Sequence, residues 1–100
     1  MKLFLWLATM ILEFLVLQDV REILFELVWG DRFEKDLVSR IGDEGRFREI
    51  RDRLLKEELV YEFVGENESP YLSLTDKGIA IVNRLDEIER ILQGENIDTE

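Results

Sequence analysis

The sequence predicts one α+β domain that is mostly helical and carries a two-stranded β-hairpin. Apolar residues recur at helical spacing in several segments that are separated by turn residues. Segments 59–64 and 71–74 instead alternate apolar and polar residues, which is typical of half-buried strands. The segment between these strands contains Gly, Asn, Ser and Pro, which favours a hairpin connection. We expect the domain to span residues 1–94, followed by a solvated tail at 95–100.

Composition excludes most catalytic chemistry. The chain has 100 residues, enough for one domain, and contains no Cys and no His. Disulfides, thiol and imidazole catalysis and most zinc or iron sites are therefore excluded. The sequence also has no phosphate-binding Gly-rich loop and no Gly-x-Ser-x-Gly elbow. We predict no catalytic residues, no cofactor and no metal. The many charged residues and few Asn and Gln resemble a thermophile's amino-acid usage.

The first element is the almost entirely apolar segment 3–17. Its length and residue types favour a helix that is buried or forms a dimer. Two alternatives are a signal peptide, which lacks a small-residue cleavage site here, and a membrane span, which needs about 20 apolar residues. The segment is shorter than that and is interrupted by Glu13, so we expect a cytoplasmic protein without a membrane partner.

Three further helices follow. The first, 20–29, is expected to begin after Asp19, since Asp19 and Glu22 have the spacing of a capping box. Gly30 is placed to end it. A short helix at 33–40 comes next.

A third helix, 44–58, begins after the turn at Gly42 and Asp43. Two short helices joined by a tight turn, with the second leading into a β-hairpin, have the order of a helix-turn-helix. The apolar positions of the third helix have helical spacing: Phe47, Ile50, Leu54 and Leu55.

The last helix, 76–92, is predicted by the segment 71–78, in which a strand runs directly into a helix. Thr75 stands at the N-cap position, and Asp76 is favourable in the first turn. Apolar residues four, three and four positions apart form a seam along it: Ile81, Leu85, Ile88 and Leu92. With segment 3–17, which is too apolar to lie free on a monomer, this seam predicts a homodimer through helices 3–17 and 76–92.

A helix-turn-helix followed by a hairpin and then by Leu-Thr-Asp-Lys-Gly at 74–78 resembles the winged-helix domains of MarR-like and PadR-like prokaryotic and archaeal regulators. The resemblance covers residues 19–92. It implies a winged helix-turn-helix fold with extra N-terminal and C-terminal helices. It also implies a transcriptional regulator that binds double-stranded DNA and inserts helix 44–58, the recognition helix, into the major groove.

The residues 46–56 form the positive island of a chain whose net charge is −10. By the resemblance, its outward basic side chains are the groove and phosphate contacts: Arg46, Arg48, Arg53 and Lys56. Ser39 and Arg40, beside the turn, add possible phosphate contacts.

Other observations favour different functions. Arg48 and Asp52, Glu49 and Arg53, and Asp52 and Lys56 have the spacing of ion pairs on a solvated helix. Glu66 and Glu68 at the wing tip would repel phosphates. An acidic winged helix that binds a protein partner instead of DNA is therefore the alternative, and a membrane-anchored regulator is a third.

Overall fold

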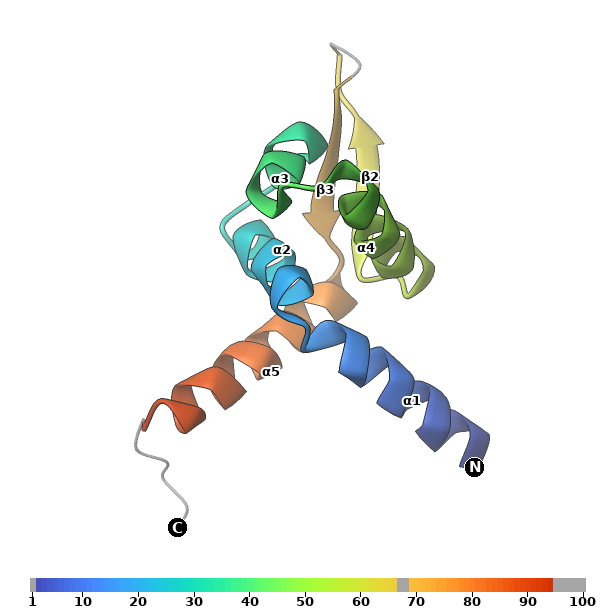
Figure 1. The fold of residues 1–100 in the computed structure, drawn as a ribbon, viewed down its shortest axis with the longest axis vertical. Helices are drawn as coiled ribbons and strands as arrows, with labels where there is room; N and C mark the ends of the chain where they lie inside the picture. Colours follow the sequence, from blue (N-terminus) through green and yellow to red (C-terminus); the bar gives the residue numbers. More distant parts are fainter. Residues whose placement is uncertain (1, 67–68, 95–100) are drawn as a thin grey trace.

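The computed structural model describes residues 2–66 and 69–94, so the expected tail at 95–100 and Glu68 of the wing tip lie outside the described residues. The described part contains five helices and three strands (Figure 1). In chain order they are α1 (Lys2–Leu15), α2 (Gln18–Val28), β1 (Arg32–Phe33), α3 (Glu34–Ile41), α4 (Glu44–Lys56), β2 (Val60–Val64), β3 (Pro70–Leu74) and α5 (Asp76–Leu92).

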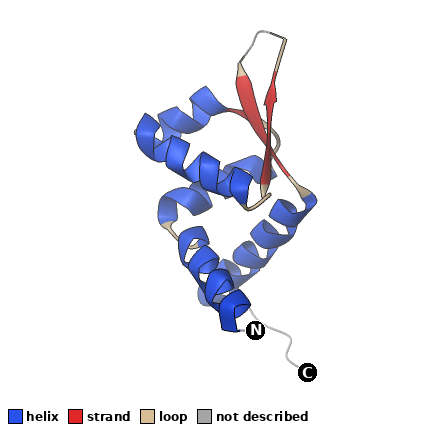
Figure 2. Ribbon diagram, turned by 90° about the vertical axis from the view of Figure 1, so that its right-hand side faces the viewer, coloured by secondary structure: helices blue, strands red, loops and turns tan. Residues whose placement is uncertain are grey.

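The predicted fold class is confirmed: the protein is a mostly helical α+β winged helix with helices added at both ends. The strands form one antiparallel sheet in the order β1-β3-β2. Figure 2 shows the β2–β3 hairpin, the wing, extending beyond the helices. Strand β1 was not predicted, because two residues are too short for a period-2 pattern. Its pairing of Phe33 with Tyr71 makes the sheet three-stranded.

One hydrophobic core lies where α2, α3, α4 and α5 meet the inner face of the sheet. Each helix contributes the residues of one face. On α4 these are the predicted Phe47, Ile50 and Leu54. On α5 they are Val82 and Leu85, whereas Ile88 and Leu92 of the predicted seam are exposed. The fully buried large side chains are Val20, Ile23, Leu24, Leu37, Phe47, Ile50, Leu54, Leu59, Leu72 and Val82.

The junction between the wing and α5 confirms the predicted N-cap. The Thr75 hydroxyl accepts a hydrogen bond from the Gly78 backbone N–H at 2.9 Å and donates one to the Glu58 carbonyl at 2.8 Å. The Thr75 N–H also donates to the Leu59 carbonyl at 3.0 Å. Gly78 is packed so closely against that carbonyl that any Cβ would collide with it. Therefore both Thr75 and Gly78 serve to seat α5 on the end of α4.

Two predicted helix starts are wrong. Helix α2 begins at Gln18, with Leu17 at the N-cap, so Asp19 lies inside the first turn and does not form a capping box. The side chain of Asp19 instead binds Arg46 from α4. Helix α3 begins at Glu34, one residue after the predicted start, because Phe33 is held in β1. It ends at Ile41, and Gly42 follows as its C-cap in the left-handed conformation. Helix α4 ends at Lys56, two residues before the predicted end.

Helix α1 is not buried within one chain. It extends away from the body on the side opposite the wing, and α5 diverges from it on the same side (Figure 1). Only Leu15 of its described side chains is fully buried, whereas Trp6 is 60% exposed. Of the two predicted roles, burial in a single chain is thus wrong and dimer formation stays a prediction. No helix in the described part of the chain has the length and apolar character needed to cross a membrane.

Candidate nucleic-acid interface

Helices α3 and α4 form the predicted helix-turn-helix. The Asp43 carboxylate caps α4 by accepting a hydrogen bond from the Arg46 backbone N–H at 3.0 Å. The residues Phe47, Ile50 and Leu54 fix the inner face of α4 against the core. The opposite face of α4 is exposed, and it is the surface that the sequence predicted to bind DNA.

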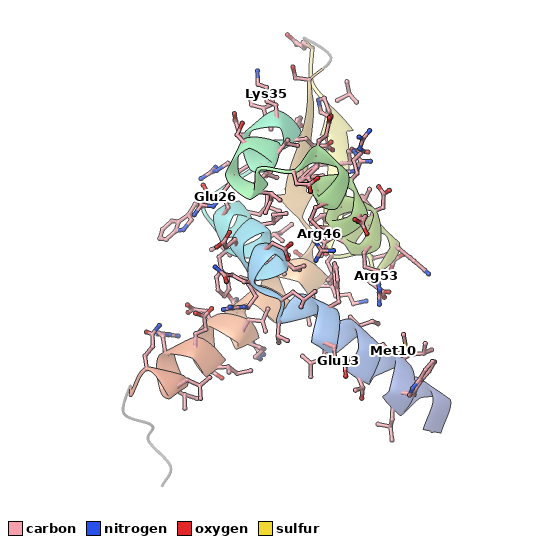
Figure 3. All side chains as sticks on the ribbon, viewed as in Figure 1. Met10, Glu13, Glu26, Lys35, Arg46 and Arg53 are labelled. Atoms are coloured by element: carbon pink, nitrogen blue, oxygen red, sulfur yellow. The ribbon has the colours of Figure 1, made fainter. Side chains whose placement is uncertain are left out.

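Arg46 is turned toward α2. Its guanidinium donates two hydrogen bonds to the Asp19 carboxylate, from Nε to Oδ2 at 2.7 Å and from Nη2 to Oδ1 at 3.2 Å. The hydrogen bond from Arg46 lowers the pKa of Asp19 below its ordinary value of 3.8. Figure 3 shows Arg46 between α2 and α4. A two-point contact of this kind fixes both helices, so Arg46 connects elements of the fold.

Arg53 is turned toward α1. Its guanidinium lies 5.1 Å from the centre of the Phe14 ring, which is a cation–π distance, and its Nε donates to Glu57 Oε2 at 3.4 Å. In Figure 3 its side chain lies at the end of α4 nearest α1. Arg53 therefore attaches the end of α4 to α1.

Arg51 is the residue on which three elements converge, and sequence reasoning did not select it. Its Nη1 lies 3.0 Å from Glu34 Oε1 at the start of α3 and 3.7 Å from Glu62 Oε2 on β2. Glu34 is only 6% exposed. Burial raises the pKa of Glu34 from 4.5 to about 7; the neighbouring Glu62 adds to the increase and Arg51 opposes it.

Arg48 and Lys56 are the predicted contacts of α4 that remain exposed on its outer face. The Arg48 side chain is 58% exposed, and its contact to Glu44 is long, at 3.9 Å. Arg48 also lines a hollow of about 430 Å³ between α3, α4 and the wing, together with Lys35, Ser69 and Pro70. Lys35 was not predicted, because a single lysine in an acidic segment gives no sequence signal.

Ser39 and Arg40, the two residues beside the turn, are exposed but already make contacts within the protein. Ser39 Oγ donates to the Lys35 carbonyl at 3.1 Å, and Arg40 Nη1 lies 3.6 Å from Glu26 Oε2. A hydroxyl that donates to its own helix can still accept a hydrogen bond. The Arg40 side chain is about half exposed.

Acidic residues share the outer face of α4. Glu44, Glu49 and Asp52 are all exposed there. The predicted pairing is wrong in its partners: Arg48 pairs with Glu44, Arg53 with Glu57, and Asp52 with Arg51. The positive island of the sequence is therefore not a positive surface, because three of its five bases point to carboxylates on other faces of α4 or on other elements.

Among the described residues, no group of three or more acidic side chains is placed to hold a metal ion.

Comparison with known proteins supports the fold. No protein-family model matches the sequence, and no curated protein matches it. Among solved structures, the chain is similar to the apo form of a mutant of ZitR from Lactococcus lactis, with a TM-score of 0.66. The match covers 92% of this chain and 72% of that chain at 19% sequence identity. A likeness at this identity shows a shared winged-helix fold.

Proposed function

We propose that this protein is a DNA-binding transcriptional regulator in which α4 is the recognition helix. The observation that carries the proposal is the exposed outer face of α4, where Arg48 borders a hollow shared with the start of α3 and with the wing. A helix presented in this way fits the major groove, whose width admits one α-helix.

The proposed contacts are the basic side chains that remain exposed. Arg48 is placed for a base edge, because its guanidinium can form two hydrogen bonds to guanine. Lys56, Lys35, Arg40 and Ser39 are placed for phosphates. We assign Arg46 and Arg53 to contacts between helices. To reach DNA, Arg46 would have to give up its hydrogen bonds to Asp19 on α2, and Arg53 its contact with Phe14 on α1.

We further propose that the regulator is a homodimer formed through α1 and α5. Large apolar side chains are exposed on both helices, including Leu5, Trp6 and Leu12 on α1 and Ile88 and Leu92 on α5. An apolar groove of about 320 Å³ lies between the two helices, lined by Ala8, Ile11, Leu15 and Ile81 among others. Contiguous exposed apolar side chains of this kind mark an interaction surface, and a second copy of the chain offers a complementary one. A two-fold dimer would present two α4 helices to half-sites about 34 Å apart.

A selection of bound duplexes from a random pool at low salt tests the proposal. We expect enrichment of a short two-fold symmetric motif, and loss of that enrichment in an Arg48→Ala variant. An absence of any enrichment for the parent protein would overturn the proposal.

A second function is favoured by one observation, the three carboxylates Glu44, Glu49 and Asp52 against the two bases on the outer face of α4. An acidic winged helix of this kind would bind a basic protein surface instead of DNA. Replacing Glu49 by Gln separates the two functions: the change should strengthen DNA binding, because it removes repulsion from phosphates, but weaken binding to a basic partner.

A further inference from the structure

A row of four aromatic side chains covers the outer face of the sheet, and neither the core nor the proposed DNA surface uses it. The Phe33 and Tyr71 ring centres are 6.3 Å apart, those of Tyr71 and Phe63 are 5.4 Å apart, and those of Phe63 and Tyr61 are 5.9 Å apart. Phe33, Phe63 and Tyr61 are exposed, and Tyr61 is 54% exposed. An exposed aromatic surface of this extent marks a binding site.

The strand register explains why these rings are together. Tyr71 is paired directly with Phe33 on β1 and with Phe63 on β2. Residues that are directly opposite in a sheet lie on the same face, whereas the next residue, Leu72, points to the other face and is fully buried in the core. The row is therefore built by the strand pairing and lies opposite the core.

At one end of this row the rings border a pocket of about 550 Å³. The pocket is lined by Asp31, Arg32, Phe33, Gly65, Glu66 and Tyr71. The planes of the Phe33 and Tyr71 rings are inclined by 82°. Two perpendicular rings give a ligand one ring face and one ring edge, and the face of an aromatic ring is its negative region.

The charges around the pocket favour a cationic ligand. Arg32 is paired with a carboxylate outside the pocket, because its Nε lies 3.3 Å from Glu26 Oε1, and Arg40 shares that carboxylate through Oε2 at 3.6 Å. In the described part of the chain, the carboxylates of Asp31 and Glu66 have no ion-pair partner. The ammonium of Lys35 lies 5.4 Å from the Phe33 ring centre, a cation–π distance, and Lys35 is not among the residues that line the pocket. The Phe33 ring therefore already contacts one cation of the protein itself.

We propose that this pocket binds a hydrophobic organic cation, with Phe33 and Tyr71 contacting its apolar groups and Asp31 and Glu66 neutralising its charge. Aromatic rings attract a cation through their negative faces, and this attraction is strongest for weakly hydrated organic cations. An anion is disfavoured by the two carboxylates. The site is separate from the outer face of α4, so it does not depend on the proposed DNA binding.

Isothermal titration calorimetry with two isosteric probes tests the proposal in the absence of DNA. Tetraphenylphosphonium and tetraphenylborate have the same shape and opposite charge, so apolar contact alone, for example with α1, does not distinguish them. We expect saturable binding of tetraphenylphosphonium with one site per chain. We expect the borate to bind at least about tenfold more weakly, because its charge is repelled by both carboxylates.

Two variants locate the site. The Asp31→Asn, Glu66→Gln double variant should weaken tetraphenylphosphonium binding by about tenfold, since both charges are lost with little change of shape. The matched double variant Glu58→Gln, Glu87→Gln removes the same charge from exposed positions after α4 and on α5 and should bind as the parent does. In NMR spectra of the parent protein, the ring protons of Phe33 and Tyr71 should shift on addition of the cation. No saturable binding, equal affinity for the two probes, parent-like binding by the Asp31 and Glu66 variant, or unshifted Phe33 and Tyr71 signals would each overturn the proposal.

Discussion

The guanidinium of Arg51 lies 3.0 Å from the carboxylate of Glu34, and this contact joins the middle of α4 to the buried start of α3. Glu62 on the wing strand β2 lies 3.7 Å from the same guanidinium nitrogen. One arginine therefore sits between two carboxylates, one of them buried. Two carboxylates that share one cation cannot both be ionised at low cost, so this cluster should respond to pH.

Stability should fall as the pH rises between about 4.5 and 7. The pKa of Glu34 is raised from 4.5 to about 7 in the folded protein, so the folded state binds more protons than the unfolded state within this window. Its stabilising contribution is complete below 4.5 and is lost as the pH passes 7. Glu34→Gln cannot ionise and should be more stable than the parent at pH 8 by about 1–2 kcal/mol.

Urea denaturation at pH 5.5 and pH 8 measures this difference. The Glu87→Gln variant, which alters an exposed carboxylate on α5, provides the control and should follow the parent at both pH values. If Glu34→Gln retains the pH dependence of the parent, Glu34 is not the group responsible.

Arg46→Ala should destabilise the protein by about 1 kcal/mol, because it breaks the two hydrogen bonds to Asp19 that connect α2 and α4 at a partly exposed site. Arg46→Lys should recover only part of the loss, since an ammonium cannot form the two-point contact. Thermal or urea denaturation measures both changes. If Arg46→Ala left stability unchanged but reduced DNA binding, Arg46 would be a DNA contact and not a contact between helices.

Gly78→Ala should destabilise the protein by about 1–3 kcal/mol, because the added Cβ collides with the Leu59 carbonyl and forces α5 away from the end of α4. Gly45→Ala is the matched control, since Gly45 is also helical but its Cβ would lie 3.4 Å from its nearest neighbour, Asp43 Oδ1. That change should be neutral or stabilising, because alanine favours helices over glycine by about 1 kcal/mol. Urea denaturation of the two variants measures the difference. An equal loss of stability in both variants would contradict the proposed collision at Gly78.

Trp6→Asp combined with Met10→Asp should convert the proposed dimer into a monomer. Both side chains are exposed on α1, so the changes place charge in the dimer interface without disturbing the core of one chain. Light scattering at micromolar concentration measures the mass. Val64→Asp, at an exposed apolar position on the wing, should leave the dimer intact. A parent protein that is monomeric under these conditions would contradict the proposed assembly.

The elements that the sequence predicted well are those specified by neighbouring residues. The helix at 76–92, its cap at Thr75 and the buried face of α4 all follow from spacings of a few residues. Strand β1 could not be predicted, because its two residues become a strand only by pairing with β3. The start of α2 was misplaced because Asp is a favoured N-cap residue, whereas the side chain of Asp19 binds Arg46, which lies 27 residues away in the sequence.

The candidate site was predicted less completely for the same reason. The sequence located the basic island, but the direction of each base depends on carboxylates distant in the chain: Asp19 for Arg46 and Glu34 for Arg51. Spacing along α4 predicted different pairs, because it takes account only of residues on the same helix. Arg48 is exposed on the outer face as its spacing predicted, and its contact with DNA stays a prediction.

The most direct test of the proposed function is a titration of the selected duplex with the parent and with two double variants at two salt concentrations. Arg48→Ala with Lys56→Ala removes both bases from the outer face of α4. Arg84→Ala with Arg90→Ala removes the same charge from α5 and serves as the control, after light scattering has shown that its assembly is unchanged. We predict that the parent binds the duplex at low salt. The free energy of DNA binding of the α4 variant should be weaker, and the loss of Arg48 alone should account for about 1–3 kcal/mol of the difference. Its salt dependence should also become shallower, by about 0.9 for each phosphate that the variant no longer neutralises, whereas the α5 variant binds as the parent does. Equal binding by all three proteins, or no binding by the parent at low salt, would contradict the assignment of α4 as a recognition helix.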